Sequence, residues 1–233
     1  MASQMTDCSG MKISFIVPVL NEAGYIAQTL MPLRQYREQG HEVIVIDGGS
    51  DDDSVSVAEL HADKVLRGES GRALQMNHGI EAAQGDVLLF LHADTRLPQD
   101  SVVKIINAME DGYFWGRFNV RLSGDRFIFR IIERMMNLRS CLTGVATGDQ
   151  AIFVSRESVD IIGNYPGLPL MEDVVFSKRL RSLGWPACVK SRVTTSSRRW
   201  EDNGILRTML LMWRLRLLFI MGVPAEKLAK QYR

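Results

Sequence analysis

Acidic residues stand directly after apolar runs at three places in this sequence. The run at residues 88–91 leads into His92 and Asp94, and two earlier runs lead into Glu22 and Asp47. A carboxylate at the end of a buried strand loses hydration, which is costly unless it is paired, solvated or bound to a cation. We therefore expect Asp94 to have a positive partner.

A divalent metal ion is the partner that suits Asp94 chemically. Mg²⁺ takes one or two protein carboxylates and completes its shell with water and substrate phosphates, so one aspartate suffices if a diphosphate arrives with the ion. The nearby His92 makes Mn²⁺ a competitor for Mg²⁺. These residues also leave open that His92 and Asp94 only end the strand and cap the helix after Pro98.

The second acidic site is the segment "DGGSDDDS", which begins at Asp47. Paired glycines let the backbone approach a ligand closely, whereas a helix start needs only a single capping serine or aspartate. Neither GxGxxG nor GxxxxGK[ST] occurs, which disfavours a dinucleotide-binding domain and a P-loop. The segment therefore indicates recognition of a base or ribose rather than of phosphate.

The elements that must position these residues are short apolar runs alternating with helical segments. Apolar residues recur every three or four positions in the intervening segment 22–40, as in a helix. This alternation predicts a parallel sheet covered on both faces, with ligands bound beyond the carboxyl ends of its strands. The predicted strands cover residues 12–20, 42–47, 64–67 and 86–94.

Composition narrows the class of protein. The chain has 233 residues, enough for one sizeable core, and its 28 lysines and arginines nearly balance 27 acidic residues, so no overall field draws it to nucleic acid. The cysteines, Cys8, Cys141 and Cys188, are widely spaced without a CxxC pair, which favours a reducing compartment and disfavours zinc. We read these cysteines as structural or incidental. Residues 1–10 contain no apolar run and are expected to be a disordered leader of a cytoplasmic protein.

Several ordered segments of the chain resemble family-2 glycosyltransferases of the GT-A fold. They are "SFIVPVLNEAGYI", "VIVIDGGSDDDS", "GRALQMNHGIEAAQGDVLLFLHADT" and "MEDVVFSKRLRSLG". More narrowly, "ATGDQAIFV", "RRWEDNGILRTMLLMWRLRLL" and "LAKQYR" resemble the bacterial branch associated with selenium and radical-SAM proteins. The resemblance covers residues 11–233. It implies a GT-A catalytic domain over 11–200, whose mostly parallel nucleotide-binding sheet has helices on both faces, and a C-terminal helical extension over 201–233.

The resemblance also implies a donor site for a nucleotide-diphosphate sugar. It assigns Asp47 to the base, Glu22 to the nucleoside and Arg72 to the nucleotide or diphosphate. Asp94 matches the last aspartate of the family's DxD motif and is the expected ligand of Mg²⁺ or Mn²⁺. His92 replaces the first aspartate of that motif, so the usual ribose contact is altered. The full set of expected donor-binding residues is Pro18, Glu22, Asp47, Gly49, Arg72, His92 and Asp94.

The catalytic pair implied by the resemblance is Glu172 and Asp173. Acids in a first helical turn usually compensate the helix dipole, but the family's "ED" motif makes Asp173 the general base. An inverting transfer needs such a base to take the proton of the attacking acceptor hydroxyl. Glu172 is expected to orient Asp173 or contact the acceptor. The residues expected on the acceptor side are Gly148, Asp149, Arg199 and Trp200, the last two matching part of the QxxRW motif.

The C-terminal stretch 205–223 is strongly apolar but is interrupted by Arg207, Arg214 and Arg216. Arginine at the centre of a span is costly, so this pattern disfavours a membrane-spanning helix. It favours a helix that lies in a membrane interface or packs on the catalytic domain. We therefore expect peripheral contact with the inner face of the membrane, and an acceptor that is unknown but for which a lipid or isoprenoid is a candidate.

Together these observations predict an inverting, metal-assisted glycosyltransferase. A nucleotidyltransferase would normally carry a glycine-rich loop with a basic residue after the first strand, which "PVLNEAGYI" lacks. An inactive sugar- or lipid-binding module would be expected to have lost Asp94 or Asp173, and both are present. These two classes remain the alternatives.

Overall fold

The computed structural model describes residues 10–232. The leader expected over residues 1–10 lies outside the described residues, apart from its last position. The strands are β1 (Ile13–Val19), β2 (Glu42–Asp47), β3 (Lys64–Arg67), β4 (Val87–Phe90), β5 (Thr95–Arg96), β6 (Trp115–Leu122), β7 (Phe153–Ser155) and β8 (Ala187–Thr195).

Helices occupy most of the segments between the strands. In the first half they are α1 (Ala23–Leu30), η1 (Met31–Leu33), α2 (Arg34–Arg37), α3 (Ser54–Glu59), α4 (Arg72–Ala82) and α5 (Ser101–Glu110). In the second half they are α6 (Phe127–Thr143), η2 (Gly148–Gln150), α7 (Arg156–Ile162), α8 (Glu172–Arg181), α9 (Arg198–Asp202), α10 (Ile205–Ile220) and α11 (Ala225–Tyr232).

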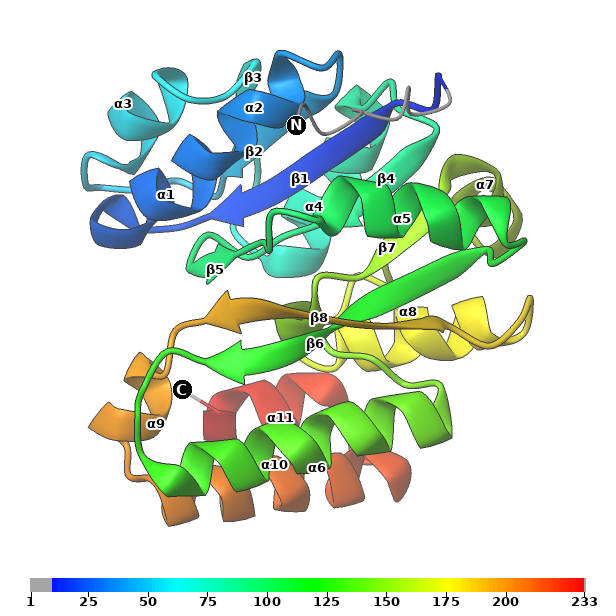
Figure 1. Ribbon diagram of the computed structural model, residues 1–233. Helices are drawn as coiled ribbons and strands as arrows, with labels where there is room; N and C mark the ends of the chain where they lie inside the picture. Colours follow the sequence, from blue (N-terminus) through cyan, green and yellow to red (C-terminus); the bar gives the residue numbers. More distant parts are fainter. Residues whose placement is uncertain (1–9, 233) are drawn as a thin grey trace.

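One mixed, mostly parallel sheet of eight strands runs through the molecule in the order β3-β2-β1-β4-β7-β6-β8-β5 (Figure 1). The pairs β3-β2, β2-β1 and β1-β4 are parallel, as the alternation of apolar runs predicts. Strands β7 and β5 are antiparallel to their neighbours. The α/β fold class predicted from the sequence is therefore confirmed.

Two predicted elements differ from the structure. The run predicted as a strand over 86–94 leaves the sheet ladder after Phe90, and the chain turns where the Thr95 amide donates to the His92 carbonyl at 3.0 Å. The segment predicted as helical over 22–40 is divided into α1, η1 and α2. The break falls at Pro32, because proline lacks the amide hydrogen and its ring collides with the preceding turn.

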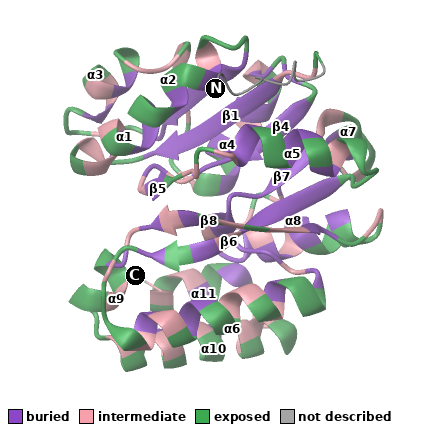
Figure 2. Ribbon diagram, viewed as in Figure 1, coloured by how far each residue is buried: buried purple, intermediate pink, exposed green. Residues whose placement is uncertain are grey.

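Two hydrophobic clusters fill the spaces between the sheet and its helices. Alternate residues of β1 point to opposite faces: Phe15 and Val17 pack with Ile26 of α1, whereas Ile16 packs with Met76 of α4. Figure 2 shows the central strands buried along most of their length between these two helix layers. The sheet is thus held rigidly from both sides, which fixes the positions of its carboxyl ends.

The C-terminal helices pack beneath the second half of the sheet (Figure 1). Leu215 of α10 and Leu228 of α11 are buried against Leu170, Met171 and Val174 at the start of α8. Within residues 10–232, no helix combines the length and the apolar character needed to cross a bilayer.

A disulfide joins Cys141 of α6 to Cys188 of β8, with the two Cα atoms 6.0 Å apart. The sequence indicates only that these cysteines are structural or incidental, and it does not predict this bond. The two cysteines are 47 residues apart and do not form a CxxC motif, so the sequence gives no sign that they pair. The packing of α6 on the sheet brings them together.

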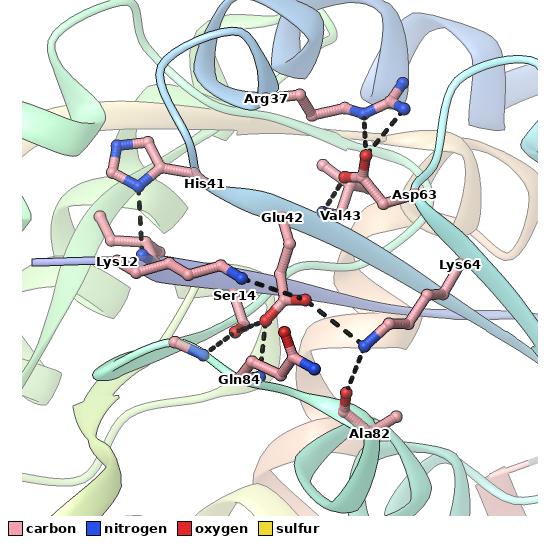
Figure 3. A network of polar contacts seen from close by, with 12 residues as sticks. Lys12, Ser14, Arg37, His41, Glu42, Val43, Asp63, Lys64, Ala82 and Gln84 are labelled. Carbon is pink, nitrogen blue, oxygen red and sulfur yellow. Dashed lines mark hydrogen bonds and ion pairs between the residues drawn. The ribbon is translucent and has the colours of Figure 1, made fainter.

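A polar network joins the amino ends of β1, β2 and β3 (Figure 3). The Glu42 carboxylate is 5% exposed and accepts hydrogen bonds from the Ser14 hydroxyl and the Gln84 amide, both at 2.6 Å. The ammonium groups of Lys12 and Lys64 lie 3.7 and 3.6 Å away. Burial by itself would raise the pKa of Glu42, but these hydrogen bonds and charges outweigh it and the pKa lies below its ordinary value.

We predict that Glu42→Gln lowers the free energy of unfolding at pH 7 by about 1–3 kcal/mol, because it removes a buried, fully bonded charge. The folded-state pKa is depressed, so this stabilisation is present above the unfolded-state value of about 4.3 and is lost as pH falls through the folded-state value. Urea unfolding at pH 7 and at pH 3 measures both effects.

The control is Glu38→Gln, which removes an exposed ion pair with Arg34 and should change stability by less than about 0.5 kcal/mol. Equal effects of the two substitutions, or a Glu42→Gln effect that persists unchanged at pH 3, would contradict the role given to the network.

Candidate active site

Glu22, Asp47 and Asp94 stand at the edge formed by the carboxyl ends of β1, β2 and β4. Asp47 is the last residue of β2 and pairs in register with Val19, the last residue of β1. Glu22 follows β1. Asp94 follows β4, which pairs with β1 on the side opposite β2. Burial raises the pKa of Glu22, a rise that Arg198 opposes and to which the negative charge of Asp94 adds. Glu22 and Asp94 are therefore neighbours in space, and Asp47 ends the strand beside them.

Arg198 neutralises part of this charge and was not among the residues predicted from the sequence. One of its guanidinium nitrogens lies 3.1 and 3.2 Å from the two carboxylate oxygens of Glu22, and the guanidinium lies 4.5 Å from the centre of the Tyr25 ring. The pairing spans 176 residues of sequence. Nothing in the local sequence distinguishes Arg198 from its neighbour Arg199.

Asp47 organises the loop that follows it. Its carboxylate is buried and accepts the amide hydrogens of Gly49 and Ser50 at 3.0–3.2 Å, while Arg67 lies 3.8 Å away. Gly49 has φ +95°, a conformation that glycine adopts without strain. The loop borders a cleft of about 410 Å³, which is lined by Asp47, Ser50, Asp52, Val55, Glu59, Val65, Leu66 and Arg67.

Gln75 of α4 is a further residue at this edge that sequence reasoning missed. Its buried side-chain amide donates to the carbonyl oxygens of Val19 and Ile46, both at 2.8 Å. These two bonds clamp the ends of β1 and β2 together. The position of Asp47 relative to Glu22 therefore depends on α4 as well as on the sheet.

His92 and Asp94 occupy the turn after β4. Burial, and after it the charge of Arg72, lower the pKa of His92 well below its ordinary value, so the imidazole is neutral at pH 7. The His92 Nε2 atom is buried against Gly148 and has no hydrogen-bond partner among residues 10–232. The Asp94 carboxylate accepts one hydrogen bond from a described residue, from Thr95 at 3.3 Å.

These residues fit a cation that draws most of its ligands from elsewhere. No group of three or more acidic, histidine or cysteine side chains arranged for a metal occurs within residues 10–232. Asp94 accepts a single hydrogen bond from residues 10–232, so its carboxylate can still take a ligand ion, whereas the His92 Nε2 atom is buried against Gly148. A hard ion bound mainly by water and phosphate oxygens needs no more than this from the protein.

Glu172 and Asp173, the residues predicted to be the catalytic pair, lie in the first turn of α8, and the predicted helix start is confirmed. The Asp173 carboxylate accepts the Gly148 amide hydrogen at 2.9 Å, which fixes it beside the segment expected on the acceptor side. Glu172 is 4% exposed and lies 3.5 Å from Arg72. Burial, and after it the charge of Asp173, raise the pKa of Glu172. Asp149 is next to Thr147 and Asp173, and burial raises its pKa as well.

Arg72 lies among the carboxylates of both halves of the site. Its side chain is 48% exposed at the surface of the site, and the negative charges of Glu172, Asp173 and Asp94 raise its pKa. The Arg72 guanidinium therefore lies near Asp94 as well as near Glu172 and Asp173. Arg72 occupies the region where the resemblance places the diphosphate.

The backbone is strained at this site. Within residues 10–232, the non-glycine residues with positive φ are Asn21 (54°), Ala151 (46°) and Met171 (66°). Asn21 and Met171 stand directly before Glu22 and Glu172, and Ala151 follows η2. Such conformations cost about 1–3 kcal/mol each and concentrate where function requires an exact side-chain direction.

The two predicted residues of the RW motif take different positions. Arg199 lies over the Tyr232 ring at 3.5 Å from its centre and donates to the Tyr232 carbonyl at 2.6 Å. The charges of Arg72, Asp173 and Asp149 all influence the pKa of Tyr232. Tyr232, the last residue of α11, therefore lies near these three residues. Trp200 instead packs against a cluster that contains Phe129 of α6, a position that favours packing over contact with an acceptor.

A comparison with protein families shows the family of the chain. Residues 14–159 match the model of glycosyl transferase family 2, which is more than half of the chain. The chain belongs to this family. The matched segment contains all the residues predicted for the donor side, and Gly148 and Asp149 of the predicted acceptor side. Glu172, Asp173 and the C-terminal helices follow it.

Curated relatives agree with the family. An uncharacterized glycosyltransferase of Haemophilus influenzae is 28% identical over 175 residues, which cover 70% of this chain and 69% of that protein. The undecaprenyl-phosphate 4-deoxy-4-formamido-L-arabinose transferase of Proteus mirabilis is 27% identical over 151 residues. The chain spans 59% of its own length in that match but only 46% of the Proteus protein.

Solved glycosyltransferases share the GT-A fold seen here. S. aureus TarS (residues 1–349) superposes with a TM-score of 0.62 at 19% identity, covering 80% of this chain and 61% of TarS. The mannosyltransferase PcManGT of Pyrobaculum calidifontis, solved with GDP-Man and Mn²⁺, has a TM-score of 0.61 at 19% identity and covers 79% and 56%. At these identities the likeness concerns the fold alone.

We predict that Gly148→Ala disrupts the family-2 site by packing. The added Cβ would overlap with the His92 Nε2 atom, so the imidazole or η2 must move. Such overpacking costs about 1–3 kcal/mol and should also displace Asp173, which bonds the Gly148 amide. Chemical denaturation measures the stability loss.

Gly167→Ala is the matched control, because its Cβ would enter open space at a backbone angle that alanine adopts. An unchanged stability for Gly148→Ala would show that His92 is not held against η2.

Proposed function

We propose that this chain is an inverting glycosyltransferase that moves a sugar from a nucleotide-diphosphate donor to an acceptor hydroxyl. The observation that carries the proposal is the position of Arg72 among Asp94, Glu172 and Asp173. One cation thereby connects the acid assigned to the donor diphosphate with the acids assigned to the acceptor. Membership of family 2 supports this assignment of the two halves.

The donor side would hold the nucleoside and the diphosphate. In this proposal Asp47 and the Gly49 loop receive the base and ribose beside the cleft of about 410 Å³. Glu22, which is paired with Arg198, contacts the nucleoside. Pro18, near the end of β1, also belongs to the proposed donor site. The neutral His92 takes the place of an aspartate in this region.

Asp94, with His92 beside it, would hold a Mg²⁺ or Mn²⁺ ion together with the donor diphosphate. Such an ion supplies positive charge against the charge that develops on the departing diphosphate. Arg72 contributes a second, fixed positive charge from the protein. The Mn²⁺ complex of PcManGT supports this view of the fold.

Asp173 would act as the general base. Its carboxylate takes the proton of the acceptor hydroxyl, the acceptor oxygen bonds to the anomeric carbon, and the bond from that carbon to the diphosphate oxygen breaks. The Gly148 amide keeps Asp173 oriented throughout. Glu172, next to Arg72, keeps the arginine aligned, and Asp149 and Arg199 line the acceptor side.

The acceptor is proposed to be a lipid or isoprenoid reached from the membrane surface by a cytoplasmic protein. The Proteus mirabilis relative, which is named for undecaprenyl phosphate, supports a lipid-linked acceptor. The apolar helix α10 packs directly on the start of α8, next to Asp173. A lipid acceptor bound along α10 would therefore lie close to Asp173, the proposed base.

We predict that Asp173→Asn lowers the rate of nucleoside-diphosphate release from the cognate nucleotide sugar by about 10²–10⁴-fold, because the proton acceptor is lost. Donor affinity should stay within threefold of wild type. Asp94→Asn should instead weaken metal-dependent donor binding. Release from a panel of nucleotide sugars, with Mg²⁺ or Mn²⁺, measures the rates.

Asp160→Asn on the exposed surface of α7 is the control and should match wild type. Wild-type turnover by Asp173→Asn would refute its role as base. No release by the wild-type chain with any donor would favour an inactive binding module.

A further inference from the structure

Helix α11 directs Tyr232 toward the first turn of α8. Leu228 and Tyr232 are four residues apart, so they lie on one face of α11. Leu228 is fully buried, and both side chains belong to the cluster that contains Met171 and Val174. These two cluster residues stand on either side of the predicted catalytic pair in the sequence. The tyrosine therefore lies beside the acids at the start of α8.

Arg199 fixes the direction of the Tyr232 side chain. The guanidinium covers one face of the ring, 3.5 Å from the ring centre, and one of its nitrogens donates to the Tyr232 carbonyl at 2.6 Å. A planar guanidinium stacked on an aromatic ring is a favourable contact that favours one orientation of the ring. The position of the phenol is thus set by Arg199 as well as by the packing of α11.

The Tyr232 hydroxyl lies close to the Arg72 guanidinium. After Glu172, Tyr232 is the group whose charge acts most strongly on Arg72, ahead of Asp173 and Asp94. The half-buried Tyr232 side chain forms no hydrogen bond through its hydroxyl within residues 10–232, and that oxygen is not among the fully buried atoms that lack a partner there. A cation and an available O–H donor side by side are suited to an anion.

The phenol is protonated at neutral pH. Burial raises the pKa of Tyr232 above its ordinary value, and the charges of Arg199 and Arg72 oppose this rise without cancelling it. A protonated phenol cannot take the proton of an acceptor hydroxyl, so it does not share the role proposed for Asp173. It can donate its hydrogen to a phosphate oxygen.

We propose that Tyr232 is a further catalytic residue, whose hydroxyl donates a hydrogen bond beside Arg72 to the departing nucleoside diphosphate. This inference rests on the proposed function and adds a residue to its site. As the bond from the anomeric carbon to the diphosphate oxygen breaks, the electron pair of that bond stays on the oxygen. The phenol keeps its proton and stabilises the new charge through the hydrogen bond.

Calorimetric titration tests this contact without an acceptor. The full chain is titrated in Mg²⁺ with the nucleoside diphosphate that gives the largest rise in Tm, and with the corresponding monophosphate. Tyr232→Phe, which keeps the ring over Arg199, should weaken diphosphate binding at least about fivefold, because a hydrogen bond to a charged group is lost. Monophosphate binding should be unchanged, since the monophosphate lacks the outer phosphate that carries the leaving oxygen.

The rate of transfer gives a second readout. Tyr232→Phe should lower kcat for nucleoside-diphosphate release by about 10–100-fold, because the bond strengthens as the leaving group gains charge. The KM for the nucleotide sugar should stay close to that of the wild type. A residue with only a structural role would not separate kcat from KM in this way.

Tyr113→Phe is the matched control, because Tyr113 is 43% exposed and precedes the amino end of β6, outside the site. It should match the wild type in every titration. Tyr232→Leu separates the ring from the hydroxyl: if it weakens diphosphate binding while Tyr232→Phe does not, only the ring matters and the proposal is overturned. Equal weakening of monophosphate and diphosphate by Tyr232→Phe would also overturn it, because the contact would then lie elsewhere on the nucleotide.

Failure of the proposed function is visible in the same titrations. If the wild type binds the diphosphate and Tyr232→Phe binds it equally well, only this inference is overturned. If the wild type binds no nucleoside diphosphate, the donor assignment is overturned as well.

Discussion

The crowding of carboxylates at one edge of the sheet is the constraint on which the rest of this structure depends. Glu22, Asp47 and Asp94 converge there because parallel strands deliver their carboxyl ends to the same place. Burial and the charge of Asp94 raise the pKa of Glu22, and this cost must be offset by positive charge. Arg198 does so for Glu22, and Arg72 lies near Asp94 as well as Glu172 and Asp173.

The second half of the molecule is arranged around the same problem. Asp173 is fixed by the Gly148 amide, and the start of α8 is supported by α10 and α11. Helix α10, which packs against the start of α8, also exposes Leu206, Leu210 and Leu217 to solvent.

Much of the fold could be predicted from the sequence because its signals are local. Apolar runs at β1, β2 and β3, and acids directly after β1, β2 and β4, identify a parallel sheet and its functional edge. The partner of Glu22 could not be found in this way, because Arg198 is 176 residues distant and adjoins an equally plausible Arg199. The disulfide and the approach of Tyr232 likewise depend on packing between distant elements.

The central claim is that the carboxylate edge binds a nucleoside diphosphate together with a divalent ion. The most direct measurement is calorimetric titration of the chain with each nucleoside diphosphate, in Mn²⁺ and in excess chelator. The account predicts binding of one nucleotide with one-to-one stoichiometry that weakens at least tenfold in chelator. Equal affinity with and without the metal would contradict the role of Asp94, and no binding of any nucleoside diphosphate would contradict the account as a whole.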